Sequence, residues 1–180
     1  MMDVVEEILF SKEDLKSICR RLGKEISKDY KGRELFLIGM LKGATLFMAD
    51  LIREINIPCY IDFMEASSYV GTKNSGGEVK ITKYLRNDIR GMDVLIIEDI
   101  LESGFTLNTV VKILEKQNPK SLRICTLLDK PESRKIKNIK ADYVGAEVSK
   151  DKFVIGYGFD YNEKYRNLPF VGVMNLKYAD

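Results

Sequence analysis

The chain has 180 residues and is nearly neutral, with 29 Lys and Arg against 27 Asp and Glu and a formal net charge of +2. This balance argues against partners held mainly by charge, so we expect neither nucleic acid nor a membrane as a partner. The chain contains no histidine. This excludes Ser-His-Asp and Cys-His nucleophiles and His-ligated metals, and leaves acid–base chemistry to carboxyl, Lys, Tyr or Cys groups.

The first half of the chain is predicted to alternate between helices and strands. Ser11 and Asp14 have the spacing of a capping box, and the apolar residues that follow recur at helical spacing. Gly32 is expected to end this helix. Residues 34–39 form a short apolar run that is typical of a strand buried on both faces. The next expected elements are a helix over 44–55, a strand over 60–64 and a long loop with lid-like composition over 67–78.

The second half continues the alternation. Strands are expected over 79–84, 93–99, 122–128, 141–148 and 153–156, with a helix over 105–116. Strands that alternate with helices indicate βαβ units, so we predict an α/β fold with an open, mostly parallel sheet flanked by helices. The length favours a single domain over residues 1–180.

The cysteines and the N-terminus indicate a cytoplasmic location. Cys19, Cys59 and Cys125 are far apart and form no C-x-x-C pair, which is typical of thiols in a reducing compartment. The first residues are acidic, unlike the basic start of a secretory signal. Every apolar stretch falls short of the roughly 20 residues that span a bilayer.

The most informative segment is 94–106, VLIIEDILESGFT. An apolar strand delivers Glu98 and Asp99 to its carboxyl end, where open parallel sheets bind their ligands. The turn that follows opens a helix, whose free N–H groups suit a phosphate. Carboxylates beside a phosphate repel it, so we expect them to bind sugar hydroxyls or a metal. The hydroxyls of Ser103 and Thr106 are also expected at this phosphate. Gly104 has no side chain and would let the backbone approach the anion closely.

This segment resembles the phosphoribosyl pyrophosphate (PRPP) signature of type I phosphoribosyltransferases. Four further segments narrow the resemblance to hypoxanthine-guanine phosphoribosyltransferases: LKGA at 41–44, SSY at 67–69, LDKP at 128–131 and DKFVIGYGFDYNEKYR at 151–166. The resemblance implies the type I phosphoribosyltransferase fold. It comprises a core over about 33–150 and a small hood from the N-terminal helix and the C-terminal segment, in a homodimer or homotetramer.

The resemblance also implies an Mg²⁺-dependent enzyme of purine salvage. Such an enzyme transfers ribose 5-phosphate from PRPP to hypoxanthine or guanine, giving IMP or GMP and pyrophosphate. Glu98 and Asp99 would bind the ribose hydroxyls or the metal. The 5′-phosphate would be held by Ser103, Gly104, Phe105 and Thr106. The pyrophosphate would be held by Leu41, Lys42, Gly43 and Arg166, with a cis peptide expected between Leu41 and Lys42.

The purine would be recognised by residues near the C-terminus. The Lys130 ammonium, which has only donors, would bind the 6-oxygen and so favour 6-oxopurines over adenine. Phe153 would stack on the purine and the Val154 backbone would read its edge. Asp160 would lie at the purine and bind Mg²⁺. Ser68 and Tyr69 correspond to the mobile loop that closes over the site and excludes water.

Two positions depart from the family pattern. Glu102 stands where the family generally carries Asp, the proposed acid–base group at purine N7. The extra methylene moves the carboxylate by roughly 1 Å, and a misplacement of that size can cost about 10²-fold in rate. We expect Glu102 to act as the acid–base group nonetheless. Val70 between Tyr69 and Gly71 is the second departure.

Two other functions stay open. A nucleotide-sensing regulator of RNA on the same scaffold, with little or no catalysis, would need an exposed basic face. The residues that could supply one are Arg134, Lys135, Lys137 and Lys140. A phosphoribosyltransferase for xanthine or a pyrimidine is the other alternative. The segments around Lys130 and Phe153 favour 6-oxopurines but do not rank hypoxanthine, guanine and xanthine.

Overall fold

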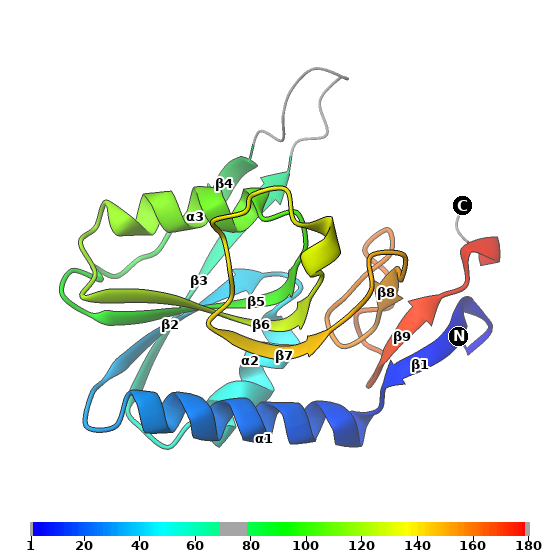
Figure 1. Ribbon diagram of the computed structural model, residues 1–180, viewed down its shortest axis with the longest axis horizontal. Helices are drawn as coiled ribbons and strands as arrows, with labels where there is room; N and C mark the ends of the chain where they lie inside the picture. The colour runs from blue at the N-terminus through cyan, green and yellow to red at the C-terminus, as the bar shows by residue number, and fades with distance from the viewer. Residues whose placement is uncertain (1, 69–78, 179–180) are drawn as a thin grey trace.

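The computed structural model describes residues 2–68 and 79–178, and within them a six-stranded sheet forms the centre of the molecule (Figure 1). The strand order is β4-β3-β2-β5-β6-β7, and all neighbours are parallel except β4, which runs antiparallel to β3 at the edge. The strands are β2 (Leu35–Leu41), β3 (Cys59–Ser68), β4 (Val79–Lys83), β5 (Asp93–Leu101), β6 (Ser121–Asp129) and β7 (Tyr143–Glu147). The predicted open, mostly parallel sheet is confirmed.

Helices cover both faces of this sheet (Figure 1). On one face lie α1 (Lys12–Asp29) and α2 (Thr45–Leu51), and on the other lies α3 (Phe105–Glu115). Alternate residues of one strand therefore enter different cores: Leu35 and Leu37 pack with α1 and α2, whereas Phe36 and Ile38 pack with α3. Burial on both faces explains why β2 is an uninterrupted apolar run.

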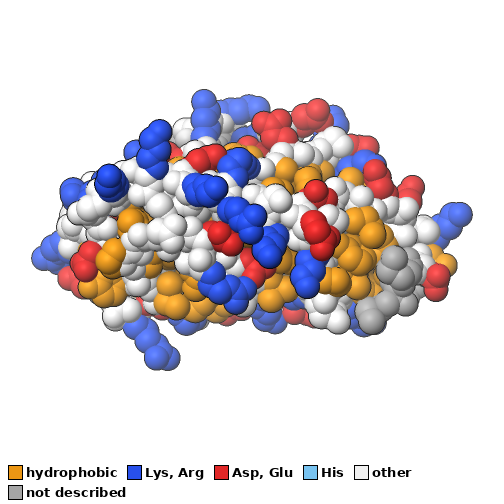
Figure 2. Space-filling view, turned by 90° about the horizontal axis from the view of Figure 1, so that it is seen from below, with side chains coloured by type: hydrophobic (Ala, Val, Ile, Leu, Met, Phe, Trp, Pro, Cys, Tyr) orange, Lys and Arg blue, Asp and Glu red, His pale blue; other side chains and the backbone are white. Residues whose placement is uncertain are grey.

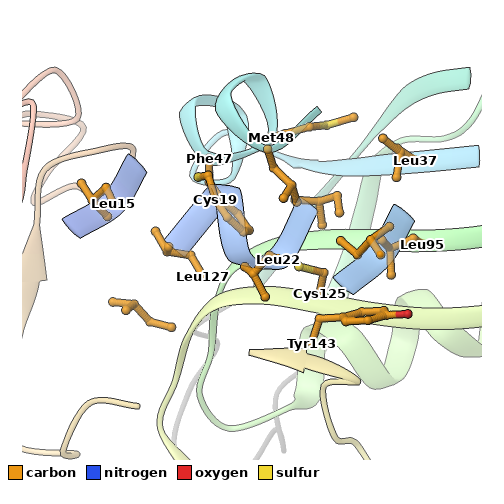
Figure 3. Packing of buried hydrophobic residues seen from close by; sticks show 14 of the residues in the cluster. Leu15, Cys19, Leu22, Leu37, Phe47, Met48, Leu95, Cys125, Leu127 and Tyr143 are labelled. Carbon is orange, nitrogen blue, oxygen red and sulfur yellow. The ribbon is translucent and has the colours of Figure 1, made fainter. Parts of the chain in front are cut away.

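The capping box predicted at the start of α1 is confirmed. Asp14 N–H donates to the Ser11 side chain at 3.1 Å, and Ser11 N–H donates to Asp14 Oδ2 at 2.9 Å. The apolar side of α1, which includes Leu15, Cys19 and Leu22, packs against α2 and the sheet (Figure 3). Its outer face carries Lys and Arg interspersed with Asp and Glu (Figure 2), which fits a solvated helix face.

Two predicted boundaries were wrong. The helix expected over 44–55 is shorter, because α2 ends at Leu51 and continues as a 3₁₀ turn over Ile52–Glu54. The loop expected from residue 67 starts later, since β3 extends to Ser68 by pairing with β4. Tyr69 and Val70 lie outside the described residues.

A second, small antiparallel sheet lies at one end of the large one (Figure 1). It contains β1 (Val5–Phe10), β9 (Val171–Met174) and β8 (Val154–Ile155), in that order. The N-terminal strand of this sheet is β1, while α1 packs against the large sheet. Short 3₁₀ turns lie at Met2–Val4, Pro131–Ser133 and Leu176–Tyr178. None of the helices in the described parts of the chain is long and apolar enough to cross a membrane.

Candidate active site

The strand order reverses between β2 and β5. The chain leaves β2 through α2 to reach β3 on one side, whereas β5 lies on the other side of β2. Ligands of open α/β sheets bind at such a reversal, beyond the carboxyl ends of the strands. A cleft of about 490 Å³ lies there. Its walls come from the turn after β2, the turn after β5 and the C-terminal segment (residues 156–168), which contributes Asp160 and Arg166.

Most of the predicted site residues line this cleft. They are Leu41, Gly43, Glu98, Asp99, Glu102, Ser103, Gly104, Phe105, Thr106, Asp160 and Arg166. The other predicted residues that the structure describes, Lys42, Lys130, Phe153 and Val154, are not part of its lining. Ser68 ends β3, and Tyr69 lies outside the described residues.

Glu98 and Asp99 form the floor of the cleft. Asp99 N–H donates to Glu98 Oε1 at 3.1 Å, and Ile100 N–H donates to Asp99 Oδ1 at 2.7 Å. None of the ion pairs found within residues 2–68 and 79–178 includes either carboxylate. Burial raises the pKa of both groups, and the neighbouring Asp99 raises that of Glu98 further. Ionising these buried carboxyl groups costs free energy, and a ligand that offers hydroxyl donors or a cation would reduce that cost.

Burial of the Glu98 carboxyl group should reduce the stability of the fold at pH 7. We therefore expect Glu98→Gln to raise the melting temperature at that pH. Because the pKa of Glu98 is raised on folding, the unfolded chain loses its proton first as pH rises. Stability therefore falls above the ordinary Glu pKa of about 4.3. Glutamine keeps an acceptor for Asp99 N–H and removes the charge. The gain should be several degrees, since about 1 kcal/mol corresponds to roughly 2–4 °C in a domain of this size.

The measurement is thermal unfolding at pH 7 and near pH 4, where the difference between variant and wild type should shrink. Glu6→Gln, on the exposed side of β1, removes a glutamate charge without this burial and should leave the melting temperature nearly unchanged. A lower melting temperature for Glu98→Gln at pH 7 would contradict the raised pKa.

The N-terminus of α3 forms the wall next to these acids. Gly104 is its N-cap, at φ +88°, where an L side chain is strained. The N–H groups of the first turn have no partner within the helix and belong to residues that line the cleft. The Ser103 carbonyl accepts from Lys135 N–H and Ile136 N–H, both at 3.0 Å. The turn is thus held as a preformed anion cradle.

Arg134 is structural, which changes one sequence-based interpretation. Its guanidinium donates to the carbonyls of Leu101, Glu102 and Ile139 and pairs with the Asp129 carboxylate. The side chain is only 8% exposed. It therefore braces the turn after β5 and does not belong to an exposed basic face.

Glu102 and Lys130 meet because β5 and β6 are in register. Leu101 lies opposite Asp129, and Lys130 N–H donates to the Leu101 carbonyl at 3.0 Å. The residues that follow these two strands, Glu102 and Lys130, are then neighbours. Lys130 Nζ lies 3.0 Å from Glu102 Oε1. Lys130 is 5% exposed, whereas Glu102 is exposed. The buried Lys130 ammonium therefore contacts the Glu102 carboxylate, which lines the cleft.

The C-terminal segment supplies the opposite wall. Arg166 Nη2 lies 2.8 Å from Asp160 Oδ1, and Arg166 Nη1 donates to the Gly158 carbonyl at 2.7 Å. Its Nε is buried without a hydrogen-bond partner among the described residues, so donor capacity remains. The peptide bond between Leu41 and Lys42 is cis, as expected.

Glu163 is a further residue that the sequence did not single out. Its carboxylate lies 3.0 Å from Lys42 Nζ and 3.3 Å from Arg166 Nη2. The Lys42 ammonium, with Arg166 beside it, holds the pKa of this exposed carboxyl below its ordinary value. Glu163 thereby joins two cations that the chain separates by more than a hundred residues. Only the fold brings Lys42 to Glu163, so no local sequence pattern could have identified this contact.

The aromatic residue predicted to contact a base is accessible. Phe153 is 43% exposed, and its ring meets that of Tyr161 edge-on, with centroids 5.9 Å apart. Val154 follows it as a buried residue of β8. A large exposed aromatic ring is suited to stacking on a flat ligand.

Comparison with known proteins agrees with this geometry. Residues 6–162 match the family described as the phosphoribosyl transferase domain. The chain belongs to this family. Relatives named hypoxanthine-guanine phosphoribosyltransferase include one from Staphylococcus aureus, 49% identical over 97% of this chain and 96% of that protein. Another, from Staphylococcus epidermidis, is 50% identical over 96% of each. A crystal structure of a hypoxanthine phosphoribosyltransferase from Staphylococcus aureus superimposes with a TM-score of 0.94 at 48% identity, covering 100% of this chain and 97% of that one.

The cleft of this phosphoribosyltransferase has carboxylates that suit Mg²⁺ only in part. Within the described residues, no group of three or more acidic, Cys or His side chains is arranged to hold an ion by itself. Glu98, Asp99 and Asp160 nevertheless line one cleft from two different segments. Mg²⁺ prefers oxygen ligands and is commonly held by one or two carboxylates together with substrate phosphates. The donor set fits an ion that is shared with a phosphorylated substrate.

Proposed function

We propose that this phosphoribosyltransferase acts in purine salvage and transfers ribose 5-phosphate from PRPP to hypoxanthine or guanine. The products are IMP or GMP and pyrophosphate. The observation that carries the proposal is the pairing of a preformed anion cradle at α3 with two adjacent carboxylates in one cleft. A phosphate site beside hydroxyl acceptors fits a phosphorylated sugar, and the name and 49% identity of the relatives support the purine as acceptor.

PRPP would lie along the floor and both walls of the cleft. The N–H groups and hydroxyls of residues 103–106 would bind its 5′-phosphate, aided by the positive end of α3. Glu98 and Asp99 would accept hydrogen bonds from the ribose hydroxyls. The pyrophosphate would lie between the turn at 41–43 and Arg166, whose guanidinium suits bidentate contact with phosphate.

The purine would occupy the space between Lys130 and Phe153. Lys130 would donate to the 6-oxygen, and Phe153 would stack on the ring with the Val154 backbone at its edge. Glu102 would accept the proton that the purine loses at N7 while its N9 forms the bond to the ribose. The carbon–oxygen bond to pyrophosphate breaks in the same step, so negative charge grows where Lys42 and Arg166 lie.

Asp160, with Glu98 and Asp99, would hold Mg²⁺ jointly with oxygens of PRPP. The ion would neutralise charge on the departing pyrophosphate.

Ser68 and Tyr69 would belong to the segment that closes over the site. A core over about 33–150 with a hood, a homodimer or homotetramer, and a cytoplasmic location complete the proposal. The free thiols of Cys19, Cys59 and Cys125 support a reducing compartment.

The first test is a product assay. The protein is mixed with PRPP, Mg²⁺ and hypoxanthine, guanine, xanthine, adenine or uracil in turn, and nucleotides are separated by chromatography. We expect IMP and GMP, and no AMP. The absence of product with every base, despite measurable PRPP binding, would contradict the proposal and favour a regulatory protein on this scaffold.

Replacing Lys130 by alanine tests purine recognition. We expect kcat/KM for hypoxanthine and guanine to fall about 10- to 10²-fold, the equivalent of a charged hydrogen bond of about 1.5–3 kcal/mol. Discrimination against adenine should weaken, and KM for PRPP should change little. Lys140→Ala, an exposed lysine nearby, is the matched control and should leave the kinetics unchanged. Unaltered selectivity among purines in Lys130→Ala would contradict the assigned role.

A further inference from the structure

Tyr157 lies behind the cleft and is not part of its lining. It is buried, and it faces a separate cavity of about 290 Å³ between α1, α2 and the C-terminal segment. Its hydroxyl donates to Asp50 Oδ2 on α2 at 2.6 Å and lies 3.7 Å from Cys19 Sγ on α1. Burial raises the pKa of Tyr157, so its hydroxyl stays protonated and remains a donor. This hydrogen bond ties the C-terminal segment to α2.

The residue after Tyr157 touches both halves of the proposed pyrophosphate site. A Cβ on Gly158 would lie 2.1 Å from the Gly43 carbonyl oxygen, so the two backbones are in direct contact. Gly158 also exchanges two hydrogen bonds with Arg166: its N–H donates to the Arg166 carbonyl at 3.0 Å, and its carbonyl accepts from Arg166 Nη1 at 2.7 Å. A shift of Gly158 would therefore move the turn at 41–43 and Arg166 relative to each other.

The backbone at this point depends on a fixed Tyr157. Gly156, Tyr157 and Gly158 have φ values of +93°, +51° and +105°, three left-handed residues in a row. A non-glycine residue adopts this region only when its surroundings determine it. For Tyr157, the surroundings include the Asp50 carboxylate at one end and the Leu168 carbonyl, which accepts from Tyr157 N–H at 2.8 Å, at the other.

We propose that Tyr157 and Asp50 are a positioning pair for the pyrophosphate half of the active site. Their hydrogen bond fixes α2, and with it the turn at 41–43, against the segment that carries Asp160 and Arg166. The proposal rests on the proposed function for the identity of the ligand. It assigns these two residues an effect on PRPP and pyrophosphate, with none on the purine. Lys130 follows β6, and Phe153, although only four residues before Tyr157, is held separately because its carbonyl accepts from Met174 N–H at 2.8 Å.

The test compares Tyr157→Phe with the wild type. We expect KM for PRPP to rise about five- to tenfold, below the roughly 10²-fold that a full 1 Å misplacement can cost, while KM for hypoxanthine is unchanged. Titration calorimetry with pyrophosphate and Mg²⁺ should show a matching loss of affinity without any turnover. Asp50→Ala should reproduce the effect and add little to Tyr157→Phe, whereas Asp50→Asn, which keeps an acceptor oxygen, should restore near-normal KM.

Tyr143→Phe is the matched control. Its hydroxyl also donates to a carboxylate, Asp29 Oδ2 at 2.8 Å, but at the start of β7 beside the end of α1. This variant should lower the melting temperature and leave KM for PRPP unchanged. If Tyr157→Phe behaves in the same way, or raises both KM values equally, the positioning role is contradicted. A wild type that binds pyrophosphate but forms no nucleotide from PRPP and any base contradicts the proposed function, and a Tyr157→Phe variant that binds pyrophosphate normally contradicts the pair.

Discussion

Replacing Gly43 by alanine should lower kcat/KM for PRPP by about 10²-fold or more, because it displaces the turn at 41–43 or the Asp99 carboxylate by about 1 Å. A Cβ at this position would lie 1.7 Å from Asp99 Oδ2 and 2.6 Å from its carboxyl carbon. Real Cβ atoms essentially never approach within 3.0 Å of another heavy atom. Either the Asp99 carboxylate or the turn after β2 must therefore move. Steady-state kinetics with PRPP as the varied substrate measures the loss.

Gly32→Ala separates this effect from a general cost of removing glycine. Gly32 has φ +75°, and a Cβ there would meet no atom within 4 Å. This substitution strains the backbone and should cost about 1 kcal/mol of stability while leaving kcat/KM for PRPP unchanged. Wild-type kinetics in Gly43→Ala would show that the Asp99 carboxylate has no required position in the reaction.

The sequence predicted the part of the site that is local along the chain. The segment 94–106 contains its own strand, turn and helix start, so the order of residue types determines where Glu98, Asp99 and Gly104 lie. The apolar run of β5 identifies a buried strand, and the acids that interrupt it identify its carboxyl end. The capping box at Ser11 was predictable for the same reason, since both of its hydrogen bonds join residues three apart.

Contacts between distant segments could not be predicted in this way. The Gly43 backbone packs on the Asp99 carboxylate because the parallel strands β2 and β5 bring their carboxyl ends together. Glu163 pairs with Lys42 because the C-terminal segment folds back over the turn after β2. The turn over 131–140 shows the opposite error. Arg134 was grouped with neighbouring lysines by charge alone. Its guanidinium instead donates to carbonyls of the turn after β5 and pairs with the Asp129 carboxylate. A charge pattern does not distinguish a solvated cation from one that satisfies buried carbonyls.

Replacing Glu102 by glutamine should have the largest effect on the chemical step. General acid–base groups contribute about 10²- to 10⁴-fold in rate, and we expect a loss of kcat in that range with little change in KM for PRPP. Glutamine keeps the length of the side chain and an oxygen that can accept from Lys130 Nζ, now 3.0 Å from Oε1. It removes the ability to take the purine proton, together with the charge that pairs with Lys130. The measurement is kcat for hypoxanthine and guanine at saturating PRPP.

Glu102→Asp is the matched control, because it keeps the carboxylate and removes one methylene. We expect the rate to hold or rise, since the carboxylate is exposed and reaches over the cleft edge without being fixed by burial. A large loss in Glu102→Asp would show that the site is built around the longer side chain and its contact with Lys130. Full activity in Glu102→Gln would transfer the acid–base role to another group. Because the chain has no histidine, that group would have to be another carboxyl group or a Lys, Tyr or Cys side chain.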